Sequence, residues 1–212
     1  MRCGHPRNGV LLHTPPAVIR KVRKHFGIPE EKRILLYAPT FRSKTGGVGY
    51  RLDIGACLEV LRDRFGGDYI CLFRMHPNVA YQGTDCSEGV IPASDYPDMQ
   101  ELMAAADVMI TDYSGSMFEF MLTGRPVFLF AGDVARYLAE ERELYFTFGE
   151  LPFSLAEDET QLRQNILAFD YEAYRTACRQ FMELVGMEED GEGARVLADR
   201  ILEEIHKGQT DC

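Results

Sequence analysis

Side chains suited to binding an anion follow an apolar segment near the middle of the chain. Residues 108–110 indicate a buried strand, residues 111–116 a polar turn, and residues 117–123 a short helix that stops before a glycine. The turn contains Thr111, Asp112, Ser114, Gly115 and Ser116. Backbone N–H groups at the start of such a helix suit a phosphate, and Glu119 one turn later could reach an attached ribose. An ordinary strand–helix unit with a serine N-cap is the alternative.

Polar residues also follow two other predicted strands. The apolar runs at residues 33–38 and 69–73 alternate with helical segments, a pattern typical of a parallel, doubly wound α/β sheet. The polar residues that follow these runs are Thr40, Arg42, Arg74 and His76. The carboxyl ends of parallel strands share one edge of a sheet, where open α/β sheets bind ligands. We therefore predict one binding site built from three strand ends.

Each candidate side chain has a structural alternative. Arg7 and Arg42 could clamp a phosphate or be surface arginines. An anion beside Arg74 would hold His76 protonated, whereas a lone histidine is more often a structural hydrogen-bonding group. Asp112 is interpreted as a turn former that hydrogen-bonds its own backbone. The residue types alone leave these alternatives open.

The composition and missing motifs exclude several classes of protein. The 212 residues carry a formal net charge of −10 with a pI of about 5.0, which argues against a nucleic-acid binder. No apolar run approaches the ~20 residues of a membrane-spanning helix, and the N-terminus has no signal-peptide core. Six scattered cysteines without a CxxC pair indicate reduced thiols in the cytoplasm and no metal site. P-loop, dinucleotide-fingerprint and zinc-protease motifs do not occur.

The most basic segment is a helix predicted at residues 16–26. Its cationic side chains are Arg20, Lys21, Arg23, Lys24 and His25. We favour a solvated helix face, and contact with an anionic membrane surface or a polyanionic polymer is the alternative. Further helices are predicted at residues 54–65, 98–106, 133–141, 160–169, 171–185 and 194–206, short strands at 90–91 and 127–130, and an irregular aromatic segment at 142–153.

Short motifs occur in a fixed order along the chain. They are Gly4-His5-Pro6-Arg7-Asn8, Tyr37-Ala-Pro-Thr-Phe-Arg42, Arg74-Met-His-Pro77, Asp98-Met-Gln-Glu-Leu102, Thr111-Asp-Tyr-Ser-Gly-Ser-Met-Phe-Glu-Phe120 and Gly191-Glu-Gly-Ala-Arg195. In this order they resemble the motifs of the CDP-glycerol glycerophosphotransferase family, the teichoic-acid polymerases and primases. The resemblance extends over nearly the whole chain.

The resemblance implies a GT-B architecture with two Rossmann-like halves and an active site between them. This chain is similar only to the C-terminal, nucleotide-binding half, so the N-terminal half is an implied partner. Residues 1–14 are then expected to be a remnant of the inter-domain linker. Residues 15–155 would form the Rossmann-like domain that binds the CDP donor, and residues 156–212 would be helices that pack on it.

The resemblance also implies roles for the candidate residues. Ser114, with Gly115 and Ser116, would bind the CDP pyrophosphate, and Glu119 would hold the ribose where the family has aspartate. His76 matches one of two histidines that the family needs, and is the implied catalytic residue. The nucleotide and pyrophosphate would be lined by Arg7, Pro39, Thr40 and Arg74, and Arg42, Met75 and Thr111 complete the substrate-binding set.

The implied reaction is phosphoryl transfer without a cofactor or metal. A hydroxyl of a polyol-phosphate polymer, such as a teichoic acid or capsular polymer, attacks the β-phosphate of CDP-glycerol, and CMP leaves. The second family histidine belongs to a His-Gly-Thr-Pro motif that this sequence lacks, so we expect CDP-glycerol or CMP to bind weakly and turnover to be negligible. The expected location is the cytoplasm, with peripheral contact at the inner face of the membrane as an extension. CDP-ribitol or a UDP-sugar as donor, and a non-catalytic nucleotide-binding module, are the alternatives.

Overall fold

Six parallel strands form the sheet in the described part of the chain. The computed structural model describes residues 3–40, 42, 52–75, 88–140 and 143–210, with side chains up to residue 207. The strands are β1 (Arg33–Tyr37), β2 (Tyr69–Phe73), β3 (Val90–Pro92), β4 (Val108–Thr111), β5 (Val127–Phe130) and β6 (Ser154–Ala156). They lie in the order β3-β2-β1-β4-β5-β6, and each neighbouring pair is parallel. The α/β fold class predicted from the sequence is confirmed.

The direction in which strands are added reverses between β1 and β4. From β1 the chain adds β2 and β3 on one side, and it then returns to place β4 on the other side. Tyr37 at the end of β1 is in register with Phe73 of β2 and Ile110 of β4. The segments that follow these three strands therefore leave the sheet side by side, at the kind of crossover where open α/β sheets bind ligands.

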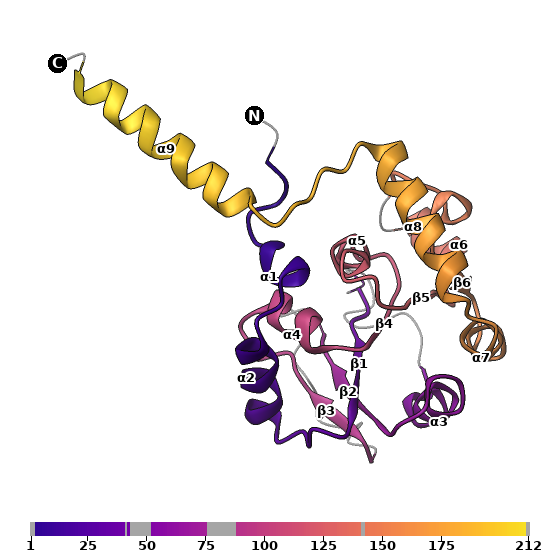
Figure 1. The fold of residues 1–212 in the computed structure, drawn as a ribbon. Helices are drawn as coiled ribbons and strands as arrows, with labels where there is room; N and C mark the ends of the chain where they lie inside the picture. The colour runs from indigo at the N-terminus through magenta and orange to yellow at the C-terminus, as the bar shows by residue number, and fades with distance from the viewer. Residues whose placement is uncertain (1–2, 41, 43–51, 76–87, 141–142, 211–212) are drawn as a thin grey trace.

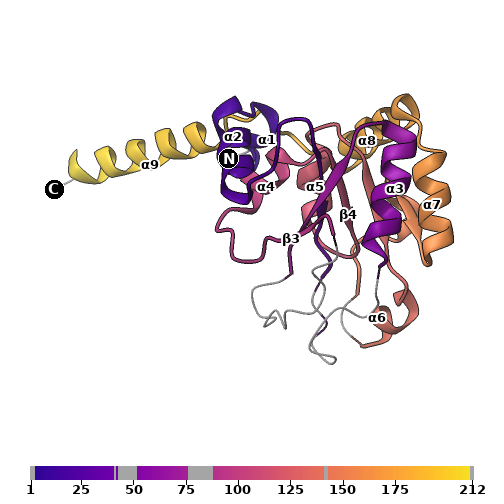
Figure 2. The same cartoon turned by 90° about the horizontal axis from the view of Figure 1, so that it is seen from below.

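Helices cover both faces of the sheet (Figure 1). One face is covered by α1 (Gly9–Leu12), α2 (Pro16–Phe26), α4 (Met99–Ala105), α5 (Ser116–Met121) and α8 (Tyr171–Val185), and the other by α3 (Ile54–Phe65) and α7 (Glu159–Leu167). Successive strand residues point to opposite faces, so Ile34 and Leu36 enter the first core whereas Leu35 and Tyr37 enter the second. Figure 2 shows α2 and α4 on one side of the strands, and α3 and α7 on the other.

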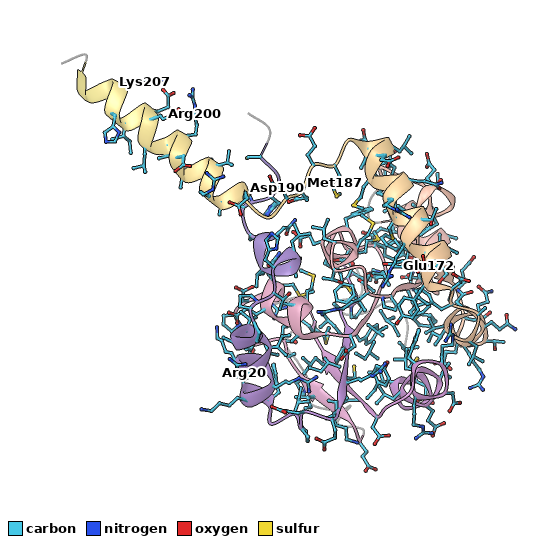
Figure 3. The ribbon with its side chains drawn as sticks, in the orientation of Figure 1. Arg20, Glu172, Met187, Asp190, Arg200 and Lys207 are labelled. Carbon is cyan, nitrogen blue, oxygen red and sulfur yellow. The ribbon has the colours of Figure 1, made fainter. Side chains whose placement is uncertain are left out.

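The last helix extends away from this three-layer body. α9 (Gly193–Thr210) points outward in Figures 1 and 2, and its side chains from Ala198 to Lys207 are exposed. Arg200 and Lys207 lie on its outer part in Figure 3, whereas Asp190 lies close to the N-terminal segment. Among the described residues, no helix has the length and apolar character needed to cross a bilayer.

Capping residues explain why several predicted boundaries agree with the structure. α3 begins after Asp53, whose side chain accepts a hydrogen bond from the Ala56 amide, and α8 begins after Asp170, which accepts one from Ala173. α8 ends at Gly186 in the left-handed conformation. The structure also contains two short helices near the predicted site, α6 (Val134–Glu140) and the 3-10 helix η1 (Phe148–Glu150).

Neither α1 nor β6 is predicted from the sequence. α1 has one turn and β6 has three residues, too few for either to show a hydrophobic period. β6 crosses the domain limit predicted at residue 155, and α7 and α8 after it pack into the same two cores as the earlier helices, whereas the described side chains of α9 enter neither core. The division into domains stays a prediction.

Candidate functional site

A cavity of about 740 Å³ lies at the carboxyl edge of β1 and β4. Its walls come from the segments after β1, β2 and β4, from the N-terminal motif and from residues 143–151. The predicted site residues on its walls are Arg7, Pro39, Thr40, Arg74, Met75, Ser114, Gly115, Ser116 and Glu119. Predicted residues from three strand ends and from a distant N-terminal segment therefore meet in one cavity.

Asp112 holds in place the turn of residues 111–116, which contributes to the cavity wall. It is fully buried, and its Oδ1 accepts hydrogen bonds from the backbone N–H of Thr40 at 2.8 Å and of Tyr113 at 2.6 Å. The bond to Tyr113 is the local turn contact expected from the sequence, and the bond to Thr40 ties the end of β1 to the end of β4. Asp112 therefore sets the spacing between two walls of the cavity.

The two serines of the turn contact each other at the start of α5. Their Oγ atoms lie 2.8 Å apart, and Ser114 Oγ also accepts a hydrogen bond from the Ser116 amide at 3.3 Å. Gly115 between them is exposed and lies on the cavity wall. A small, polar surface of hydroxyls and backbone amides thus faces the cavity, which suits an anionic group.

Glu119 is held from two sides at one end of the cavity. Its Oε1 accepts a hydrogen bond from Arg7 Nη2 at 3.2 Å, and its Oε2 accepts one from Gln100 Nε2 at 3.1 Å. Gln100 is only 5% exposed, so its amide is a fixed donor. Sequence reasoning did not single out Gln100, although its neighbours in the Asp98–Leu102 motif mark the helix that carries it.

Arg74 is anchored by the loop that follows β3. Its Nη1 donates to the carbonyl oxygens of Ala93 at 3.1 Å and Tyr96 at 2.6 Å, and burial lowers the pKa of the guanidinium. The amide of Met75 donates to Ser94 Oγ at 3.0 Å. These contacts hold the segment after β2 against the cavity. His76, the predicted catalytic residue, lies outside the described residues.

Two predicted binding residues do not line the cavity. Thr111 is fully buried, and its hydroxyl donates to the Ala38 carbonyl at 2.7 Å, so it joins two strands. Arg42 is 2% exposed and pairs with Asp112 and Asp133, each at 3.0 Å. The expectation that Arg42 clamps a phosphate is corrected, because buried carboxylates surround its guanidinium.

Sequence reasoning missed an aromatic wall on the side of the cavity near β5. The rings of Tyr113 and Tyr137 stack with their centroids 3.6 Å apart, and both line the cavity with Phe146 and Phe148. Tyr145, also on the wall, is 94% exposed. The aromatic composition of residues 142–153 and the tyrosine of the Thr111–Phe120 motif were signals in the sequence, but neither shows which way the rings face.

The N-terminal motif is positioned by the segment before α9. Glu189 Oε1 accepts hydrogen bonds from the backbone N–H of His5 at 2.8 Å and from Asn8 Nδ2 at 3.1 Å. His13 Nε2 lies 3.2 Å from the carbonyl oxygen of Asp190. These contacts hold the short segment from which Arg7 reaches the cavity, so the first and last predicted motifs meet in the fold.

The described residues contain no cluster of His, Cys, Asp and Glu that could hold a metal ion. Cys57, Cys71 and Cys178 are buried free thiols, and Cys3 is a partly exposed one. Burial raises the pKa of Cys57 to about 12 and that of Cys178 to about 11, which keeps both thiols protonated and unreactive near neutral pH. The described groups that line the cavity are hydroxyls, backbone amides, two arginines, two glutamates, aromatic rings and apolar side chains.

Comparison with known proteins identifies the family of this chain. The family described as CDP-Glycerol:Poly(glycerophosphate) glycerophosphotransferase matches residues 1–203. The chain belongs to this family. The family that the sequence motifs resemble is therefore confirmed.

Individual relatives share sequence with this chain, and a solved structure shares its fold. The teichoic acid glycerol-phosphate transferase of Staphylococcus aureus (strain NCTC 8325 / PS 47) is 30% identical over 208 residues, which cover 95% of this chain and 54% of that protein. The teichoic acid ribitol-phosphate primase of Bacillus spizizenii (strain ATCC 23059 / NRRL B-14472 / W23) is 31% identical over 207 residues, which cover 93% and 51%. A structure of a variant of the wall teichoic acid polymerase TagF, soaked with CDPG, has a TM-score of 0.79 at 27% identity and is matched over 99% of this chain and 52% of that one.

The glycerophosphotransferase-family chain thus spans about half the length of these relatives. By name, these relatives are a teichoic acid glycerol-phosphate transferase and a teichoic acid ribitol-phosphate primase. The structural similarity over nearly the whole chain agrees with the predicted fold class.

Proposed function

We propose that this chain is the donor-binding part of a glycerophosphotransferase and that the cavity binds the CDP group of CDP-glycerol. The observation that carries the proposal is that motif residues from three strand ends and from the N-terminal motif line one cavity at the crossover of the sheet. Family membership and the similarity to a polymerase soaked with CDPG support the choice of ligand.

The chemistry of the walls suits a nucleoside diphosphate. Ser114, Gly115 and Ser116 present hydroxyls and amides to the pyrophosphate, and Glu119 receives the ribose hydroxyls as an acceptor. Thr40 Oγ1 is buried and has no hydrogen-bond partner among the described residues, as expected for a group that a polar ligand completes. Arg7 and Arg74 add positive charge for the phosphates.

Transfer would proceed by attack of a polymer hydroxyl on the β-phosphate, with CMP as the leaving group. Such a reaction depends on positioning and on stabilising negative charge, which arginines, backbone amides and a protonated His76 supply. His76 keeps this role from the family motif. Because the relatives are about twice as long, we propose that turnover also needs the half of the protein that this chain does not match, and that these residues alone bind the donor weakly.

Calorimetry with CMP, CDP-glycerol and UDP tests the proposal. CMP and CDP-glycerol should bind and UDP should bind more weakly, and Ser114→Ala should weaken CMP binding by about tenfold, the value of a lost hydrogen bond to a charged group. Ser154→Ala, on the exposed end of β6, is the matched control and should bind like the unaltered chain. Equal affinity for UDP would contradict the cytidine donor, and absence of nucleotide binding would contradict both the proposed donor site and the alternative of a nucleotide-binding module.

The similarity to ribitol-phosphate enzymes favours CDP-ribitol as a second candidate donor. A ribitol-phosphate primase and a glycerol-phosphate transferase are almost equally identical to this chain. Both donors share the CDP group, so the cavity described above serves either. A competition between CDP-glycerol and CDP-ribitol for the bound state separates the two, because only the alditol differs.

The contacts made by the basic helix α2 favour a structural role for it over contact with a membrane. Lys21 pairs with Glu101 at 2.7 Å, and Arg23 Nη1 donates to the carbonyl oxygens of Pro29 and Lys32. Two of its cationic side chains therefore have partners within the chain, which favours the structural interpretation of the helix face. Contact with anionic lipid stays a prediction that vesicle binding at low and high salt would test.

A further inference from the structure

A buried ionic cluster lies directly behind the wall of the cavity. Arg42 is at its centre, with Nη2 3.0 Å from Asp112 Oδ2 and 3.1 Å from Asp133 Oδ1, and Nε 3.0 Å from Asp133 Oδ2. Its Nη1 donates to the Thr40 carbonyl at 2.5 Å. The side chain of Asp133 is 6% exposed and does not line the cavity.

Aromatic rings complete the cluster. The Tyr113 hydroxyl donates to Asp133 Oδ1 at 2.9 Å, and the Arg42 guanidinium lies 4.7 Å from the Tyr113 ring centre and 4.8 Å from that of Tyr137. Arg136 adds a second cation at 3.3 Å from Asp133 Oδ2, with its side chain 46% exposed. Asp133 thus receives two cations and a hydroxyl at once.

The cluster joins three strand ends. Arg42 follows β1, Asp112 and Tyr113 follow β4, and Asp133 follows β5. Buried ion pairs gain little stability compared with apolar residues of similar size, because the charges lose their hydration. What such a cluster can supply is a fixed arrangement of the segments that it joins.

The segments that it joins are those of the proposed donor site. Thr40 is bound through its carbonyl to Arg42 and through its amide to Asp112, and Ser114 comes directly after Tyr113. A loss of charge at Asp133 would weaken its contacts with Arg42 and with the Tyr113 hydroxyl, while Arg42 keeps Asp112 and the Thr40 carbonyl as partners. The serine turn and Thr40 would still be linked through Asp112, but they would be held less rigidly at their present separation.

We infer that Asp133 is a positioning residue for phosphate binding, acting through Arg42 and Tyr113 to hold Thr40 and the Ser114–Ser116 turn around the donor's phosphate groups. The inference rests on the proposed function. It differs from a purely structural role in one measurable way, because the phosphate-dependent part of nucleotide affinity should depend on Asp133 and the part due to the nucleoside should not.

The test compares CMP with cytidine in the unaltered chain and in Asp133→Asn. Asparagine keeps the size of the side chain and one oxygen but removes the charge that binds Arg42. We expect CMP affinity to fall by about tenfold or more, as misplacement of a binding group does, while cytidine affinity stays within about twofold. Asp107→Asn is the matched control, since Asp107 accepts a backbone hydrogen bond from Ile34 at the opposite edge of the sheet. It should leave both affinities unchanged.

A milder variant keeps the test valid if Asp133→Asn folds poorly. Tyr113→Phe removes only the hydroxyl that donates to Asp133. Tyr174→Phe removes a hydroxyl that donates to the Arg125 carbonyl at the same distance, 2.9 Å, and neither Tyr174 nor Arg125 lines the cavity. Selective loss of CMP affinity in Tyr113→Phe alone would support the inference. CMP affinity unchanged in both cluster variants would overturn it and leave the proposed function standing. No CMP binding by the unaltered chain would contradict the proposed function itself, and this inference with it.

Discussion

Arg7 Nη2 lies 3.2 Å from Glu119 Oε1. This ion pair joins the N-terminal motif to α5, the helix that follows the turn with Ser114. The Arg7 side chain is 61% exposed and that of Glu119 is 19% exposed. Such a partly exposed pair contributes little stability by itself. Its effect is to hold a carboxylate, neutralised by a cation, at the end of the cavity where the ribose of the proposed donor would lie.

Glu119→Ala should remove the preference for a ribose with free hydroxyl groups. A carboxylate that accepts two hydroxyl hydrogen bonds favours CMP over 2′,3′-dideoxy-CMP by about tenfold, so the unaltered chain should show that ratio and the variant a ratio below about threefold. Calorimetry with the two ligands gives both values. The control is Glu172→Ala, which removes an Arg–Glu pair on α8 at 3.6 Å. An unchanged ratio in Glu119→Ala would assign the ribose to another residue.

The sheet and most of its helices could be predicted because their signals are local. Residues 69–73 form an apolar run between Gly66-Gly67 and Arg74, and the strand has those limits. The site at the crossover was predicted for the same reason, since Thr40 and Ser114 each follow an apolar run and parallel strands end at one edge. Local sequence determines which residues reach that edge.

Contacts between distant segments could not be predicted in this way. Arg42 was assigned to phosphate because it follows a strand, but its partner Asp133 is 91 residues later in the chain. Nothing near Arg42 in the sequence shows that a buried carboxylate would face it. Gln100 was missed for the same reason, because its contact with Glu119 depends on how α4 packs beside α5.

The stability that Asp133 contributes should disappear at low pH. Burial alone would raise the pKa of Asp133, but the hydrogen bonds from Arg42 and Tyr113 outweigh it, so the pKa of the folded state lies below the ordinary value. The charged form is therefore favoured by folding, and its contribution is complete above the unfolded pKa of about 4 and is lost as pH falls through the folded pKa. Below that pH the unaltered chain and Asp133→Asn carry the same charge at this position.

Urea unfolding of the unaltered chain and of Asp133→Asn, measured over a range of pH, checks the direction of this pH dependence. The difference in unfolding free energy between them should be largest near neutral pH and should shrink steadily below about pH 4. Tyr174→Phe is the control, because burial raises the pKa of Tyr174 and its hydroxyl does not titrate in that range. A difference for Asp133→Asn that stays constant down to about pH 2 would mean that its charge is not what stabilises the cluster.

Gly193→Ala should loosen the N-terminal motif. A Cβ at Gly193 would collide with the carbonyl oxygen of Cys3, a backbone atom that cannot rotate away. The segment held by Glu189 would have to move, and Arg7 moves with it. Gly55→Ala is the matched control, since Gly55 also lies in the first turn of a helix and its Cβ would meet only Asp53 Oδ1 at 3.4 Å.

The two glycine variants should change the melting temperature in opposite directions. Alanine is the better helix former by about 0.5–1 kcal/mol, so Gly55→Ala should melt higher, whereas the collision should make Gly193→Ala melt lower. Hydrogen exchange followed by mass spectrometry should show faster exchange of the amides of residues 8–13 in Gly193→Ala only. These amides donate within the N-terminal turn, as Asn8 does to the His5 carbonyl at 3.0 Å and His13 to that of Gly9 at 2.9 Å. A higher melting temperature and unchanged exchange in Gly193→Ala would show that the contact with Cys3 does not hold the segment that carries Arg7.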